Sequence, residues 1–146
     1  MKVEGTYSFD AAPDRVWAIL LDPTALAACI PGCREFKEMG DNRYEVVMRA
    51  GIGAIGGTYR GKVALTDIEE GGSFRMIVEG KGSGGSIRGD SLLSLQQRDG
   101  ATQVSVDGDA RVTGIIARVG QRLIGSASKL MMDQFFQCMR LKLDDG

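Results

Sequence analysis

Histidine is absent from the 146-residue chain, and the chain has only three cysteines. Without an imidazole, a zinc site would have to be built from thiolates and carboxylates, whereas common zinc sites contain histidine or four cysteines with C-x2-C spacing. The cysteines are Cys29, Cys33 and Cys138, and an odd number argues against a disulfide framework. We therefore expect no metal site, no disulfide and no covalently bound cofactor.

The chain also lacks a large net charge of either sign and a long apolar run. The chain contains 18 basic and 19 acidic side chains, so its composition lacks the excess of positive charge that is typical of nucleic-acid-binding proteins. The start, Met1–Gly5, lacks the apolar core of a signal peptide, and no stretch reaches the roughly 18 apolar residues that cross a bilayer. These features predict one cytoplasmic domain spanning residues 1–146, with at most peripheral membrane contact on the inner face of the membrane.

The segment Cys29-Ile30-Pro31-Gly32-Cys33 places two thiols around a Pro-Gly turn. Redox pairs usually have C-x2-C spacing at a helix N-terminus, and this pair is C-x3-C. Small apolar side chains that flank a turn are the simpler interpretation. We expect no cysteine chemistry here.

Periodicity gives the order of elements. Residues 2–9 alternate like a half-buried strand, and two short helices follow, one beginning near Pro13 and one running to the Pro31-Gly32 turn. From Arg34 to Val112, alternating segments separated by turn residues predict antiparallel hairpins. The three- and four-residue spacing from Gly114 to Leu143 predicts one long helix. The fold class is therefore α+β, with a curved antiparallel sheet around a C-terminal helix.

Alternation along the predicted strands separates an apolar face from a charged one. The apolar face contains Tyr44, Val46, Met48, Tyr59, Val63, Leu65, Phe74, Met76, Val78, Leu93, Leu95, Val104 and Val106. The predicted helix turns Ile116, Val119, Leu123, Ala127, Leu130, Met131, Phe135 and Cys138 toward this face. One face of the sheet is thus expected to be covered and the other solvated.

Very small residues interrupt the apolar face at Gly61, Gly80, Gly89, Ser91 and Ala110. Opposite a helix they would leave a cavity lined by Tyr59, Phe74, Met76, Leu93, Leu123, Met131 and Phe135. At roughly 24 cal/mol per Å3, about 300 Å3 of empty space would cost about 7 kcal/mol, which favours a bound ligand. The alternative is that the glycines mark bulges that curl the sheet over a packed core.

Five segments resemble the carbon monoxide dehydrogenase G subunit (CoxG) family: Val16–Pro23, Leu26–Cys33, Gly57–Val63, Glu79–Gly82 and Gly114–Gly120. That family belongs to the helix-grip (SRPBCC) superfamily of START lipid-transfer domains, aromatic polyketide cyclases and birch-pollen-type allergens. The resemblance extends from residue 3 to residue 136. It implies a helix-grip fold and an accessory protein of molybdenum-containing CO dehydrogenase or a related hydroxylase. Such an accessory protein binds an apolar small molecule, a quinone or a lipid, or aids membrane recruitment.

Combining this resemblance with the apolar pattern predicts a ligand-binding set. Its members are Trp17, Leu26, Ile30, Ile52, Ile55, Tyr59, Phe74, Met76, Leu93, Val119, Leu123, Ala127, Met131 and Phe135. Ile52 and Ile55 lie in the segment Gly51–Gly56, which either forms an apolar loop that gates the cavity or contacts a membrane or partner, or is a hairpin connection tucked onto the sheet.

Catalysis has little support in the sequence. Most strand carboxylates alternate toward solvent, and only Tyr7, Tyr44 and Tyr59 are titratable residues expected to face inward. Three hypotheses remain in order of preference: a non-catalytic carrier of an apolar ligand, a ligand-free interaction or assembly subunit that contacts a hydroxylase, and a polyketide cyclase-like enzyme.

Overall fold

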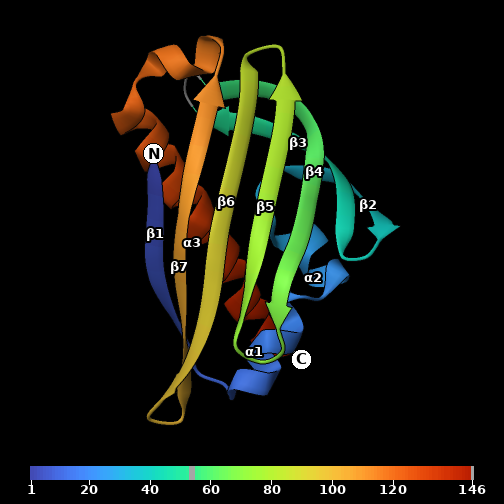
Figure 1. The fold of residues 1–146 in the computed structure, drawn as a ribbon, viewed down its shortest axis with the longest axis vertical. Helices are drawn as coiled ribbons and strands as arrows, with labels where there is room; N and C mark the ends of the chain where they lie inside the picture. Colours follow the sequence, from blue (N-terminus) through green and yellow to red (C-terminus); the bar gives the residue numbers. More distant parts are fainter. Residues whose placement is uncertain (53–54, 146) are drawn as a thin grey trace.

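The computed structural model describes residues 1–52 and 55–145, without the side chains of residues 50–55 and 145. These residues form a seven-stranded antiparallel sheet in the order β1-β7-β6-β5-β4-β3-β2 (Figure 1). The strands are β1 (Lys2–Phe9), β2 (Cys33–Gly40), β3 (Arg43–Ile52), β4 (Ile55–Glu69), β5 (Ser73–Gly82), β6 (Gly85–Arg98) and β7 (Ala101–Thr113). The predicted curved antiparallel sheet around a C-terminal helix is confirmed.

Turn residues at the ends of the strands fix the hairpins. Asp41 and Asn42 both adopt positive φ, and so do Asp99 and Gly100, which is the conformation that a two-residue hairpin turn requires. The β2–β3 and β6–β7 turns are thus built from turn residues between alternating segments, as the sequence pattern predicted.

Two short helices, α1 (Pro13–Leu20) and α2 (Pro23–Cys29), separate β1 from β2. Each begins with proline, whose missing N–H costs nothing in the first turn. The Asp22 carboxylate caps α2 by accepting a hydrogen bond of 3.3 Å from the Ala25 N–H. Both helices pack at one end of the sheet, beside the last turns of the C-terminal helix (Figure 1).

The predicted C-terminal helix is divided into two parts. A 3-10 helix, η1 (Ile115–Val119), precedes the long helix α3 (Gln121–Asp145). Gly114 and Gly120, which bound η1, have φ of 84° and 94°, and this left-handed conformation interrupts a continuous α-helix. Within α3, Ile124, Ala127 and Phe135 are buried, whereas Leu123 and Leu130, which were expected to face the sheet, are 42% and 45% exposed.

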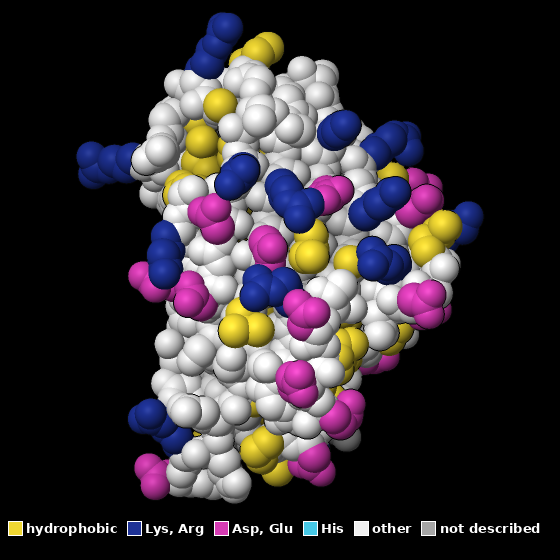
Figure 2. Space-filling model, viewed as in Figure 1, with side chains coloured by type: hydrophobic (Ala, Val, Ile, Leu, Met, Phe, Trp, Pro, Cys, Tyr) yellow, Lys and Arg dark blue, Asp and Glu magenta, His cyan; other side chains and the backbone are white. Residues whose placement is uncertain are grey.

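The core fills the space between the concave face of the sheet, α1, α2 and the second half of α3. Its fully buried large side chains are Phe9, Val16, Leu20, Leu26, Val63, Phe74, Val104, Phe136 and Met139. Every member of the predicted apolar face is buried or half-buried, which confirms the assignment of the two faces. The other face bears charged side chains (Figure 2).

The expectation that no disulfide forms is wrong for this structure. Cys29 at the end of α2 is bonded to Cys138 of α3, with their Cα atoms 5.4 Å apart, and Cys33 is the free thiol. The two residues are separated by 109 positions in the chain. Only the packing of α2 against α3 brings them together, so the count and local spacing of the cysteines carried no signal of the pair.

Candidate ligand-binding cavity

An apolar cavity of about 150 Å3 lies between the sheet, η1 and the first half of α3. Side chains of β3 to β7 form one wall, and η1 and α3 form the other. Its lining residues are Val46, Met48, Tyr59, Gly61, Val78, Glu79, Gly80, Ile87, Ala110, Val112, Ile116, Ile124, Ala127, Ser128 and Met131. The cavity is therefore at the end of the sheet opposite α1.

Small residues on neighbouring strands create this space. Gly61 of β4 lies directly opposite Gly80 of β5, so neither strand covers the concave face at that level. A Cβ at Gly61 would collide with the carbonyl of Glu79, which fixes glycine there, whereas a Cβ at Gly89 would meet nothing within 4 Å. Farther along the same strands, Phe74 and Leu93 are buried and fill the space that the glycines leave open here.

Three members of the predicted ligand-binding set line the cavity: Tyr59, Ala127 and Met131. The structure corrects the expected lining at several other positions. Trp17, Leu26, Phe74, Leu93 and Phe135 belong to the packed core at the other end of the sheet, with Ile30 and Met76 packed against it. Trp17 meets the ring of Phe74 edge-on, with the centroids 5.6 Å apart, inside this core.

Two further members of the set lie on η1 and on the first turn of α3, outside the cavity wall. Val119 is half-buried in η1, and Leu123 faces outward at the start of α3. Neither residue lines the cavity. Ile52 and Ile55 lie outside the described side chains, although their backbones pair with each other across the β3–β4 hairpin. The cavity volume of about 150 Å3 is also half of the volume considered in the sequence analysis.

Alternation alone would have found several lining residues that were missed. Ile87 and Val112 lie on the same face as Leu93 and Val106, farther along β6 and β7. Extending the period-two pattern to the strand ends includes both. Ile124 precedes Ala127 and Met131 at helical spacing on the same face of α3, so extending the three- and four-residue pattern includes it as well.

Tyr59 supplies the polar atom of greatest interest in the cavity wall. Its side chain is buried, and its hydroxyl has no hydrogen-bond partner among the described residues. A Cβ at Gly84 would lie 3.1 Å from this oxygen, so glycine is what leaves room for the hydroxyl. A buried hydroxyl without a partner costs about 1–3 kcal/mol, and a bound acceptor would remove that cost.

The other inward-facing tyrosines are already engaged and do not line the cavity. The Tyr7 hydroxyl donates to Asp133 Oδ1 at 2.7 Å, and its ring stacks on Phe136 with centroids 4.1 Å apart. Burial raises the pKa of Tyr7, and the hydrogen bond to Asp133 raises it further. Tyr44 stacks on Phe36 at 4.6 Å, and burial raises its pKa as well.

Asp133 is held as a carboxylate and faces away from the cavity. Lys129 Nζ donates to Asp133 Oδ1 at 2.6 Å. Hydrogen bonds from Lys129 and Tyr7 lower the pKa of Asp133. Within residues 1–52 and 55–145, no three histidine, cysteine or acidic side chains converge to form a metal site.

A larger, shallow depression of about 620 Å3 lies on the convex face of the sheet, open to solvent. Charged residues line most of it, and several are already paired. Arg75 Nη1 contacts Asp90 Oδ1 at 2.7 Å, and Lys2 Nζ contacts Asp107 Oδ1 at 3.2 Å. Because these charges neutralise one another in water, this depression is a poorer candidate for binding an apolar molecule than the cavity.

Comparisons with known proteins agree with this architecture. The family described as carbon monoxide dehydrogenase G subunit (CoxG) matches residues 5–144. The crystal structure of a conserved protein from Geobacillus kaustophilus aligns with a TM-score of 0.95 and 28% identity, covering 99% of this chain and 96% of that one. No curated protein matches the sequence.

More distant solved structures share the fold. A START superfamily protein from Mycobacterium smegmatis aligns with a TM-score of 0.76 at 12% identity, covering 99% of this chain and 97% of that one. Ara h 8.0201 aligns with a TM-score of 0.73 at 13% identity, covering 100% and 99% of the two chains. The fold is therefore START-like. None of the helices in the described residues has the length and apolar character needed to cross a membrane.

Proposed function

Because the chain belongs to the carbon monoxide dehydrogenase CoxG family, we propose that it is a non-catalytic accessory protein that binds an apolar ligand in the cavity under α3. Its partner is a molybdenum-containing CO dehydrogenase or a related hydroxylase. The observation that carries this proposal is the cavity of about 150 Å3 with an apolar lining and one tyrosine hydroxyl that has no partner among the described residues.

The size of the cavity limits what it holds. A dry apolar cavity of this volume suits a single ring, and pockets for whole drug-sized ligands have roughly 300–1,000 Å3. A quinone or lipid would place one ring or a few methylene groups inside, with the rest leaving between η1 and the sheet, or would displace Met131 and Ile116. A quinone carbonyl would also accept a hydrogen bond from the Tyr59 hydroxyl, which an acyl chain cannot do.

The lining supports binding more than catalysis. Among the described lining residues, Tyr59 is the one with a titratable group directed to the concave side, because the Glu79 carboxylate pairs with Arg88 on the convex face. General acid–base catalysis needs a titrating group of matched pKa within reach of the substrate. A lone tyrosine without a basic partner is suited to orienting a ligand.

Extraction of the purified protein with organic solvent, followed by mass spectrometry, tests the proposal. We expect a quinone or lipid to co-purify, and a short-chain quinone to bind by equilibrium dialysis. Ala127→Leu, which fills part of the cavity, should strongly weaken both signals, whereas Gln134→Leu on the exposed side of α3 should keep them. Failure of the wild-type protein to retain or bind either molecule would refute the carrier function.

The small volume of the cavity also favours a second candidate, a ligand-free interaction subunit. In that case a hydroxylase partner would be captured equally well by the wild-type protein and by Ala127→Leu. Loss of capture in the filled variant would instead tie partner binding to the ligand.

A further inference from the structure

The two edges of the sheet differ in how they are covered. At the β1 edge, α3 lies alongside the strand, and Arg140 Nε donates to the Ser8 carbonyl at 2.9 Å. β2 forms the other edge, and no described element lies beyond it (Figure 1). Apart from a 3.4 Å contact of the Cys33 thiol with the Glu35 carbonyl, no hydrogen bond in the described part of the chain joins the main chain of residues 34–39 to any element but β3. An edge of this kind presents main-chain groups that can pair with another strand.

The charges of β2 follow an antisymmetric order around Phe36. One residue away on either side lie Glu35 and Lys37, and two residues away lie Arg34 and Glu38. All four charged side chains are exposed, and none forms an ion pair within the residues that the structure describes. Two antiparallel copies of this strand, paired with Phe36 opposite Phe36, place unlike charges opposite each other at every charged position. A register centred on Glu35 or on Lys37 would place two like charges opposite each other.

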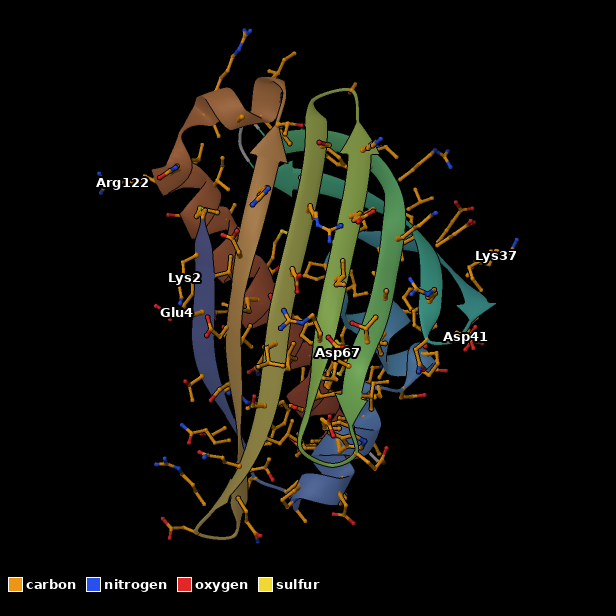
Figure 3. All side chains as sticks on the ribbon, viewed as in Figure 1. Lys2, Glu4, Lys37, Asp41, Asp67 and Arg122 are labelled. Atoms are coloured by element: carbon orange, nitrogen blue, oxygen red, sulfur yellow. A yellow bond between two sulfur atoms is a disulfide. The ribbon has the colours of Figure 1, made fainter. Side chains whose placement is uncertain are left out.

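A row of alternating charges crosses the convex face and ends at the β2 edge. Directly opposing residues on β2 to β6 alternate in sign along this row: Lys37, Glu45, Lys62, Glu79 and Arg88. Lys62 thus has an acidic neighbour on both sides, whereas Lys37 has one on the β3 side only. Figure 3 shows Lys37 at the margin of the sheet farthest from β1. In the symmetric register, Glu35 of a second copy takes the open position beside Lys37 and continues the alternation.

The centre of the strand adds an apolar contact. Phe36 is half-buried, and its ring stacks on Tyr44 with the centroids 4.6 Å apart. In the symmetric register the two Phe36 rings lie opposite each other, and aromatic cross-strand pairs stabilise antiparallel strands. The register between β2 and β3 is regular from Glu35 to Glu38 and shifts on both sides of this stretch. Because the pairing stretch is short, we expect an interface below the roughly 1,200 Å2 of stable complexes, and hence a weak, reversible association.

We propose that the β2 edge is a self-association surface, where a second copy of the chain pairs antiparallel about Phe36 and joins the two sheets into one. Any extended segment can pair with an open edge, but the charge order of β2 is complementary to itself. No residue of β2 is among the described lining residues of the cavity. The association therefore does not depend on the proposed function.

Sedimentation velocity of the purified protein, from micromolar to millimolar concentration, tests this surface. The wild-type protein should shift reversibly toward the dimer as its concentration rises. Glu35→Lys replaces two attractive cross-strand pairs of the dimer by repulsive ones. Since each pair contributes a factor of about 1.4 to 5 in either direction, the dimer should weaken roughly 50-fold. Glu4→Lys makes the same charge change at an exposed position of the opposite edge strand, and should stay within about threefold of wild type.

A mixture of two variants tests the register itself. Lys37→Glu should also weaken self-association, because the new carboxylate lies opposite Glu35 of the second copy. When Glu35→Lys and Lys37→Glu are mixed, unlike charges again lie opposite each other at both positions, so the mixture should dimerise within about tenfold of wild type. Unfolding of a variant would not restore association on mixing, and circular dichroism of each variant checks its fold.

Four results would overturn the proposal. Wild-type protein that stays monomeric throughout would leave the β2 edge to a strand of a different protein. A dimer that Glu35→Lys leaves unchanged would lie on another surface, and equal weakening by Glu35→Lys and Glu4→Lys would assign the effect to net charge. A mixture that stays monomeric would refute the antiparallel register about Phe36.

Discussion

A larger side chain at Ala127 should stabilise the protein if the cavity is empty and destabilise it if the space is already filled. Ala127 is buried in α3 and lines the cavity. Ala127→Leu adds three carbon atoms, and at about 0.8 kcal/mol for each buried carbon they would contribute about 2.4 kcal/mol. Leucine's slightly lower helix propensity and its lost rotamer freedom offset about 1 kcal/mol of this gain. The free energy of unfolding of the ligand-free protein should therefore rise by about 1–2 kcal/mol.

The empty cavity sets an upper limit on this gain. At roughly 24 cal/mol per Å3, a void of about 150 Å3 costs the protein about 3.6 kcal/mol, and one leucine fills only part of it. For a chain of this length, the expected gain corresponds to a rise in Tm of roughly 2–8 °C.

Urea denaturation of solvent-extracted protein, followed by tryptophan fluorescence, measures the change. Gln134→Leu provides the control, because position 134 is exposed on α3 and glutamine and leucine have similar helix propensities. It should change the free energy of unfolding by less than about 0.5 kcal/mol. If Ala127→Leu instead destabilises by about 1–3 kcal/mol, the site is already filled by the protein's own side chains and the cavity argument fails.

Three other changes test separate parts of the structure. Tyr59→Phe should raise the free energy of unfolding by about 1 kcal/mol, because it removes a buried hydroxyl without a partner among the described residues. The same change should weaken quinone binding. A loss of stability would mean that the hydroxyl has a partner. Cys138→Ser should lower the free energy of unfolding by up to about 5 kcal/mol, because the disulfide to Cys29 closes a loop of 109 residues. A non-reduced digest of protein taken from cells should contain the linked peptides, and their absence would return both residues to free thiols. Hydrogen bonding to Lys129 lowers the folded-state pKa of Asp133 below 3.8, so its stabilising effect is complete above that pH and is lost as the pH falls through the folded-state pKa. In Asp133→Asn, the free energy of unfolding should therefore depend less on pH below pH 4 than in the wild-type protein. An unchanged pH dependence would contradict the pairing of Asp133 with Lys129.

The sequence predicted the sheet well because its signals are local. Alternation places each strand residue on one face or the other, and Asp41-Asn42 and Asp99-Gly100 fix turn positions through their own backbone preferences. Gly61 and Gly80 were expected to leave space, and they do lie opposite each other in the cavity wall.

The prediction of the cavity lining was weaker, because lining depends on which element covers each level of the sheet. Phe74 and Leu93 have the same alternation as Gly80 and Ile87, yet they lie in the packed core while the latter two line the cavity. Periodicity predicts which face of the sheet a strand residue lies on. It does not predict whether α1, α2 or α3 packs over that residue or leaves space there. Leu123 has the same four-residue spacing as Ala127 and Met131, yet Ile124 is the residue that lines the cavity and Leu123 is 42% exposed.

By itself the sequence determined the element order, the two faces of the sheet and the family, because each is encoded by residues close together in the chain or by several segments in fixed order. The tertiary structure alone decided the Cys29–Cys138 bond and the place and volume of the cavity. These properties depend on distances between residues far apart in the chain, and those distances exist only once the helix has packed against the sheet.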